Sequence, residues 1–207
     1  MAGPDLGEDT RLAAEQGAWI LFEDEAGQTL RPPRARTWGR RGHTPVVHVS
    51  GKGSGRISIA GLLAYRAGHR PHLYYRYVTH RGRRGERRSL SEADYATLLT
   101  AAHQQLRAPI ILIWDNLNTH ISTRMRTFLD AHTDWLTVIR LPAYAAELNP
   151  VESVWAHLKR SIANNAVTGI DDLAALVKSR LRRMQYRPDL LDGFLGQSRL
   201  TLQPGQT

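Results

Sequence analysis

Runs of consecutive apolar residues mark the centre of a predicted sheet. Residues 110–114 (Ile-Ile-Leu-Ile-Trp) follow Pro109 and lead into Asp115, and residues 18–22 (Ala-Trp-Ile-Leu-Phe) lead into Glu23-Asp24-Glu25. An unbroken apolar run of this length, rich in β-branched residues, is typical of a strand buried on both faces. Both runs therefore predict central strands, and each strand runs out into carboxylates.

Weaker patterns supply the other elements. Alternation of apolar and polar residues predicts strands at 56–65 and 72–79 with a turn at Ala67-Gly68, and a fifth strand at 135–141. Helical spacing of apolar residues predicts four helices, at about residues 89–106, 122–129, 150–162 and 171–186. The end of the chain reads as a short turn around residues 190–195 and a disordered tail.

Two of these helices carry start signals. Ser89 with Glu92 resembles a capping box. For the helix predicted at 150–162, Asn149 suits the N-cap and Pro150 suits the first helical position. Glu152 then lies in the first turn of that helix. The same pattern leaves open a purely structural role for Glu152, as the reciprocal partner in a capping box.

The order of elements predicts an α/β fold. Three consecutive strands pairing antiparallel, followed by two helix-linked strands joining in parallel, give a five-stranded mixed sheet with helices on both faces. The first and fourth strands are then neighbours, which brings Asp24 beside Asp115. Strand alternation puts Asp24 on the face of Phe22, with Glu23 and Glu25 on the other.

Composition adds few constraints. With 207 residues and 42% hydrophobic residues, the chain is expected to form one domain with at most a small appendage. It has no cysteine, which excludes disulfides and thiolate metal sites. Its lack of a signal-peptide pattern and of long apolar runs predicts a cytoplasmic protein.

The net charge of +9 is concentrated in one third of the chain. Residues 26–88 hold fifteen basic residues and one acid, whereas residues 1–25 hold one basic residue and seven acids. This asymmetry indicates a polyanionic partner such as DNA. Codon bias could explain why 25 of the 28 basic residues are arginine, but not the scarcity of acids. The candidate DNA-binding residues are Arg31, Arg34, Arg36, Arg40, Arg41, Arg81, Arg83, Arg84, Arg87 and Arg88.

Convergence of Asp24, Asp115 and Glu152 would have a chemical consequence. Like charges about 4 Å apart repel by roughly 4 kcal/mol at an effective dielectric of about 20, so such a cluster takes up protons or binds a cation. Carboxylate oxygens favour Mg²⁺ or Mn²⁺, and two such ions about 3.5–4 Å apart clamp an in-line displacement at phosphorus. Viewed singly, Asp24 and Asp115 are also compatible with ordinary strand-end acids, and His120 with a loop or cap histidine.

Several motifs occur in order along residues 18–185. They are Phe22-Glu23-Asp24-Glu25, residues 37–42 (Thr-Trp-Gly-Arg-Arg-Gly), Trp114-Asp115-Asn116 with His120, residues 141–144 (Leu-Pro-Ala-Tyr) and residues 148–155 (Leu-Asn-Pro-Val-Glu-Ser-Val-Trp). Together they resemble the DDE transposases of bacterial insertion sequences in the mariner superfamily. The 36 residues between Asp115 and Glu152 are a spacing typical of that branch.

The resemblance implies a ribonuclease H-like catalytic domain at residues 18–187, after a linker remnant at 1–17 and before a turn and flexible tail at 188–207. It implies a catalytic triad of Asp24, Asp115 and Glu152 that binds two Mg²⁺ (or Mn²⁺) ions. Asn116 and His120 are supporting candidates.

The resemblance also implies cut-and-paste DNA transposition into TA dinucleotides, usually by a homodimer. The loop at 31–45 resembles the segment that contacts the partner subunit or DNA. Members of the family normally carry helix-turn-helix modules ahead of the first strand, and only about 17 residues precede it here. The chain is therefore expected to be the catalytic half alone, and three origins stay open: a second reading frame, a fragment or a relic. A separate helix-turn-helix chain is one candidate for recognition of the element ends. Two alternatives stay open: an inactive DNA-binding remnant or regulator, and a ribonuclease H-like nuclease without strand transfer.

Overall fold

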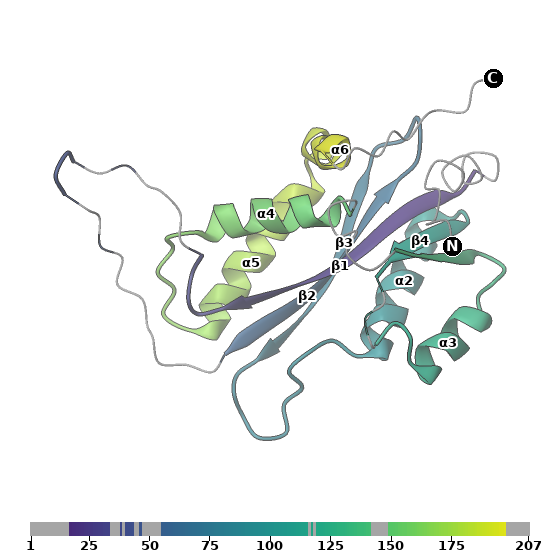
Figure 1. The fold of residues 1–207 in the computed structure, drawn as a ribbon, viewed down its shortest axis with the longest axis horizontal. Helices are drawn as coiled ribbons and strands as arrows, with labels where there is room; N and C mark the ends of the chain where they lie inside the picture. The colour runs from purple at the N-terminus through teal and green to yellow at the C-terminus, as the bar shows by residue number, and fades with distance from the viewer. Residues whose placement is uncertain are drawn as a thin grey trace.

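A computed structural model describes residues 17–33, 38, 40–43, 46, 55–115, 117, 119–141 and 149–197. These residues form a five-stranded sheet with helices on both faces (Figure 1). The strands are β1 (Trp19–Thr29), β2 (Arg56–Tyr65), β3 (His72–His80), β4 (Ile110–Trp114) and β5 (Leu136–Arg140). The helices are α2 (Glu92–Leu106), α3 (Thr123–Asp130), α4 (Val151–Ile162), α5 (Ile170–Gln185) and α6 (Pro188–Gln197).

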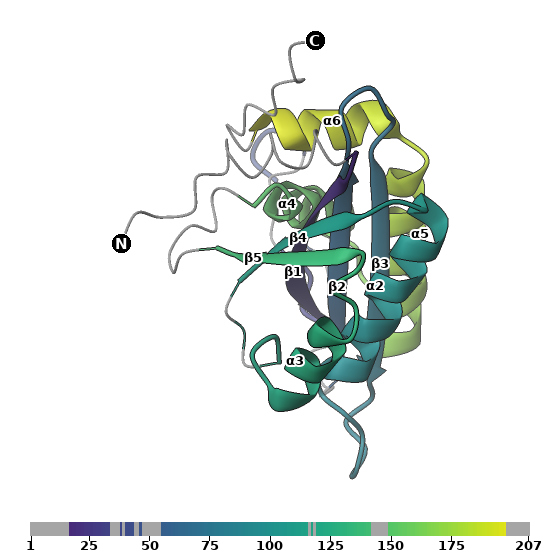
Figure 2. The same cartoon turned by 90° about the vertical axis from the view of Figure 1, so that its right-hand side faces the viewer.

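The strand order is β3-β2-β1-β4-β5 (Figure 2). β1 pairs antiparallel with β2, and β2 with β3, whereas β4 lies parallel to both β1 and β5. This is the mixed sheet that the order of elements predicts, and the predicted adjacency of the first and fourth strands is confirmed.

Each face of the sheet buries its own core. Ile20 and Phe22 of β1 pack in a cluster with residues of α4, α5 and α6. Leu21 of β1 packs on the opposite face with residues of α2 and α3. Burying one such side chain stabilises the fold by roughly 1.5–3 kcal/mol. β1 and β4 are therefore apolar on both faces because both faces are covered.

The first strand is longer than its apolar run predicts. β1 continues to Thr29, so Glu23, Asp24 and Glu25 lie within the strand rather than beyond it. β2 pairs with β1 from Ile20 to Thr29, whereas β4 pairs with it only as far as Phe22. The acids therefore begin where the parallel neighbour ends, and hydrogen bonds to β2 keep that segment extended.

Two local predictions were wrong. α2 begins at Glu92 with Ser91 as its N-cap and Asp94 as the reciprocal partner, so Ser89 and Glu92 do not form the capping box. The predicted turn at 190–195 is the helix α6, whose Leu191, Phe194 and Leu195 belong to the core. No helix within the described ranges has both the length and the apolar character to cross a membrane.

Candidate active site

Asp24 lies on the α4 side of the sheet, as alternation predicts. The indole Nε1 of Trp155 donates a hydrogen bond to Asp24 Oδ2 at 3.0 Å. Burial raises the pKa of Asp24 from 3.8 to about 6, helped by the charges of Glu152 and then Asp115, against hydrogen bonds from the Glu25 backbone and Trp155. Asp24 therefore lies within electrostatic range of both other predicted acids.

Asp115 is the first residue after β4. Its Oδ1 accepts a hydrogen bond from the backbone N–H of Leu117 at 3.0 Å and lies 3.1 Å from Nδ1 of His120. The side chain is 59% exposed. Asp115 thus presents one carboxylate oxygen to buried partners and leaves the group open to solvent.

Glu152 is an exposed residue in the first turn of α4. The turn is built by Asn149, whose side-chain Oδ1 accepts from the Val151 N–H at 3.1 Å and whose carbonyl accepts from the Glu152 N–H at 3.1 Å. Pro150 has helical angles of φ −64° and ψ −16°, so Asn149 acts as the N-cap that its sequence predicts. Among the hydrogen bonds of the described residues, those that cap the start of α4 come from Asn149, and none comes from the Glu152 carboxylate.

The three acids carry the oxygen donors that a divalent cation prefers, but the described residues form no closed metal site. Among the described residues, no lysine or arginine forms an ion pair with Asp24, Asp115 or Glu152. Nor does any group of three or more histidine or acidic side chains there surround a common point as metal ligands. Mg²⁺ usually keeps several waters and binds through one or two carboxylates plus substrate phosphate oxygens, so an open set of acids suits it better than a closed cage.

Glu23 and His120 form a buried pair behind Asp115. Glu23 is 2% exposed and His120 1%, and their Oε2 and Nε2 atoms lie 3.3 Å apart. The geometry does not make this contact a hydrogen bond, and neither atom finds another partner within the described structure. The His120 ring stacks on Trp114 at 4.1 Å. His120 therefore lies in the turn before α3, which agrees with the loop position that the sequence left open, but its ring is buried in the core.

Burial acts oppositely on the two members of this pair. It raises the pKa of Glu23, with further contributions from the charges of Glu25, Asp24 and Asp115. It lowers the pKa of His120, although contacts with Asp115 act the other way. The neutral forms of both side chains are thus favoured by the low dielectric around them.

Residues 19–174 match the family described as DDE superfamily endonuclease. The chain belongs to this family. No curated protein is similar enough to match.

Solved structures extend the likeness to the fold of this DDE endonuclease. The Mos1 mariner paired-end complex with Mg has a TM-score of 0.62 at 12% identity, covering 95% of this chain and 60% of that one. The Mos1 paired-end complex with the left transposon end gives 0.56 at 14%, covering 96% and 62%. The Mos1 catalytic domain gives 0.50 at 13%, covering 93% and 91%. The fold is that of ribonuclease H-like transposase catalytic domains, and the chain spans about 60% of the length of the chains in the complexes.

The structure brings the three predicted acids of this DDE endonuclease into one region and surrounds them with residues that sequence patterns missed. The sequence singles out none of Glu23, Gly61 and Trp155 as a site residue. Only the spacing of Trp155 three residues after Glu152 offered a signal, since positions i and i+3 lie on one side of a helix.

The predicted DNA-binding arginines differ in their contacts, because some form ion pairs with acids of this chain. Arg81 pairs with Asp171 at 2.6 Å and Arg87 with Asp94 at 2.6 Å, so both are held by acids. All described arginines of the set are exposed, including these two; the others are Arg31, Arg40, Arg41, Arg83, Arg84 and Arg88. Arg34, Arg36 and Asn116 lie outside the described residues. DNA contact by this set stays a prediction.

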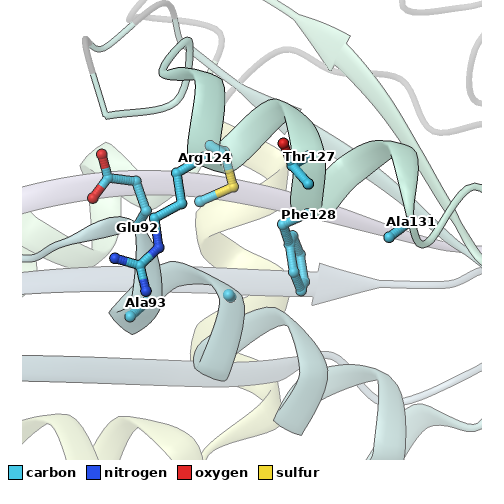
Figure 3. Close-up of a pocket in the computed structure, with 8 residues that line it drawn as sticks. Glu92, Ala93, Arg124, Thr127, Phe128 and Ala131 are labelled. Carbon is cyan, nitrogen blue, oxygen red and sulfur yellow. The ribbon is translucent and has the colours of Figure 1, made fainter.

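A hollow of about 420 Å³ lies between α2 and α3 (Figure 3). Its walls are mainly apolar and include Met125 and Phe128, with Glu92 and Arg124 among the polar lining residues. None of the three acids lines it. The hollow is therefore separate from the candidate active site.

Proposed function

We propose that this chain is the catalytic domain of a DNA transposase of an insertion sequence. It cleaves DNA strands at the element ends with the help of divalent ions, and it transfers the freed 3′-OH to target DNA. The observation that carries the proposal is the contact between α4 and β1: Trp155, one turn after Glu152, donates a hydrogen bond to Asp24 at 3.0 Å. β1 also pairs in parallel with β4, which ends at the residue before Asp115. The pKa of Asp24, raised to about 6 by burial and then by the charges of Glu152 and Asp115, agrees with this placement.

In this proposal Asp24, Asp115 and Glu152 hold two Mg²⁺ or Mn²⁺ ions. Bound ions of this kind polarise a phosphoryl oxygen and lower the pKa of an attacking water or hydroxyl. The chain itself orients the acids: His120 lies against Asp115, and Trp155 donates to Asp24. Asn116 is proposed to assist next to Asp115. The arginines of residues 31–41 and 81–88 bind the phosphodiester backbone.

The proposed partners are the DNA of the element ends and a TA-containing target. The fold-level neighbours include a Mos1 paired-end complex with transposon-end DNA and a Mos1 strand transfer complex. We extend this to a homodimer of the present chain, with a separate helix-turn-helix chain supplying end recognition. These assignments go beyond the residues described in the structure and rest on the family.

A cleavage assay with matched acid variants tests the proposal. Asp115→Asn keeps the size of the side chain but removes its charge, and Asp130→Asn makes the same change on the exposed end of α3. Loss of a metal ligand removes several kcal/mol of transition-state stabilisation, so Asp115→Asn should slow Mg²⁺- or Mn²⁺-dependent cleavage by roughly a thousandfold or more. Asp130→Asn should cleave like the wild type.

The other outcomes identify the alternatives. Full cleavage by Asp115→Asn refutes the assignment of the triad. Salt-sensitive DNA binding without any nicking by the wild type favours the inactive regulator. Cleavage of nicked element ends without joining to a target plasmid favours a nuclease that lacks strand transfer.

A further inference from the structure

We infer that Trp155 is a positioning residue that fixes the placement of Asp24 relative to Glu152. Gly61 leaves room for the indole of Trp155, and Asn149 forms a second hydrogen-bonded link between the same two elements. The inference deepens the proposed function and rests on it. Trp155 touches Asp24 but not the reacting atoms, so it acts through the acid that it holds.

The first observation is the buried hydrogen bond from α4 to β1. Trp155 is 1% exposed, and its Nε1 donates to Asp24 Oδ2 at 3.0 Å. Trp155 stands one helical turn after Glu152 on the same helix. Because a helix is rigid over one turn, fixing the indole on Asp24 also fixes the start of α4, and Glu152 with it, relative to Asp24.

The second observation is the space that the indole occupies. Gly61 of β2 is the register partner of Asp24. A Cβ at Gly61 would lie 2.8 Å from Cη2 and 2.9 Å from Cζ2 of Trp155, closer than real Cβ contacts allow. The backbone of Gly61 does not have the positive φ that would demand glycine. The missing side chain therefore serves the indole, not a turn.

The third observation is an independent tie between the same two elements. Asn149 is 6% exposed, and its Nδ2 donates to the backbone carbonyl of Glu23 at 2.7 Å while its Oδ1 caps the Val151 N–H. One side chain thus joins the residue before Asp24 to the helix start before Glu152. Two hydrogen bonds at adjacent strand residues, one buried and one partly buried, fix the docking of α4 more narrowly than apolar packing alone.

Trp155→Phe separates positioning from packing because it keeps an aromatic ring but removes the donor. Trp19→Phe is the matched control. Trp19, like Trp155, is a buried tryptophan, 4% exposed, but it lies at the start of β1 and contacts His69 and His72. Binding of Mn²⁺ to the full chain without DNA, measured by electron paramagnetic resonance, should weaken roughly 10-fold in Trp155→Phe, as expected for a lost hydrogen bond to a charged group. Trp19→Phe should match the wild type.

Gly61→Ala tests the space directly. Its methyl group must displace the indole, so Mn²⁺ binding should weaken by a similar factor. Gly193→Ala is the control, since nothing lies within 4 Å of a Cβ at that position. Wild-type Mn²⁺ affinity in either Trp155→Phe or Gly61→Ala overturns the positioning role.

A spectroscopic arm covers the case in which a variant fails to fold. The Trp155 indole resonance in the ¹⁵N–¹H spectrum of Asp24→Asn should be shifted from its position in the wild-type spectrum. An identical position in the two spectra overturns the inference. Failure of the proposed function looks different. Wild-type protein that neither binds Mn²⁺ nor cleaves DNA overturns the metal site and the positioning role with it. Wild-type protein that does both, with an equally active Trp155→Phe, overturns only the positioning role.

Discussion

Glu23 and Asp24 are adjacent on β1 yet meet opposite environments. Asp24 faces α4, is partly exposed, and accepts a hydrogen bond from Trp155. Glu23 faces the α2 and α3 side, is 2% exposed, and lies 3.3 Å from Nε2 of the buried His120. On the α4 flank of β1, the carboxylate of Asp24 can bind a cation. On the opposite flank, the carboxyl group of Glu23 is buried below the proposed metal site.

The difference teaches how one strand serves two purposes. The α4 flank holds Asp24 by a donor that favours its ionised form, so the carboxylate stays available to a cation. The other flank excludes water around Glu23, and His120 reaches from Glu23 to Asp115. We therefore expect loss of His120 to be felt mainly as stability, and changes at Asp24 mainly as altered charge.

The largest effect should come from breaking the buried flank. His120→Ala removes the ring that stacks on Trp114 and lies against Glu23, and the resulting cavity should lower the free energy of unfolding by roughly 3 kcal/mol. His103→Ala is the control, because the half-buried His103 stacks on Trp135 at 4.0 Å and forms no ion pair with an acid among the described residues. Urea unfolding should show a clearly larger loss for His120→Ala. Equal losses would mean that the Glu23 contact adds nothing beyond stacking.

A smaller effect should come from titrating the charged flank. Burial raises the pKa of Asp24 from 3.8 to about 6 and that of Glu25 from 4.5 to about 7. The folded protein then binds protons more tightly than the unfolded chain, so metal-free stability is highest below about pH 4 for these groups and falls as pH rises towards 7. Asp24 alone accounts for roughly 2 kcal/mol of this loss.

Thermal unfolding between pH 4 and 8 checks this sign. Asp24→Asn should flatten the decline, Asp130→Asn should not, and Mg²⁺ should restore stability at pH 8 only when Asp24 is present. A metal-free stability that rises from pH 4 to 7 would contradict the account of the charged flank.

Local signals explain why much of the fold could be predicted. The bounds of β4 follow from an unbroken apolar run ended by a proline and an acid. The buried positions of α4 follow from helical spacing after a good cap. Sheet order followed from chain connectivity, because parallel strands need a crossover and consecutive strands do not.

The errors arose where distant residues decide. β1 extends through three acids because β2 hydrogen-bonds to it there. Ser91 rather than Ser89 caps α2, where Arg76 and Arg87 from outside the helix hold Asp94 at 2.7 and 2.6 Å. The contacts of Trp155 with Asp24 and of His120 with Glu23 join residues that no local pattern connects. The sequence therefore offers His120 as a supporting candidate but does not identify its contact with Glu23.

The central claim is that Asp24, Asp115 and Glu152 form one divalent-cation centre. The most direct measurement is anomalous scattering from crystals of the wild-type protein soaked in Mn²⁺, with crystals of Asp24→Asn soaked in parallel. The account predicts Mn²⁺ coordinated by oxygens of Asp24 and of at least one of the other two acids, and loss of that signal in Asp24→Asn. Mn²⁺ bound elsewhere, or a site that survives Asp24→Asn unchanged, would contradict it.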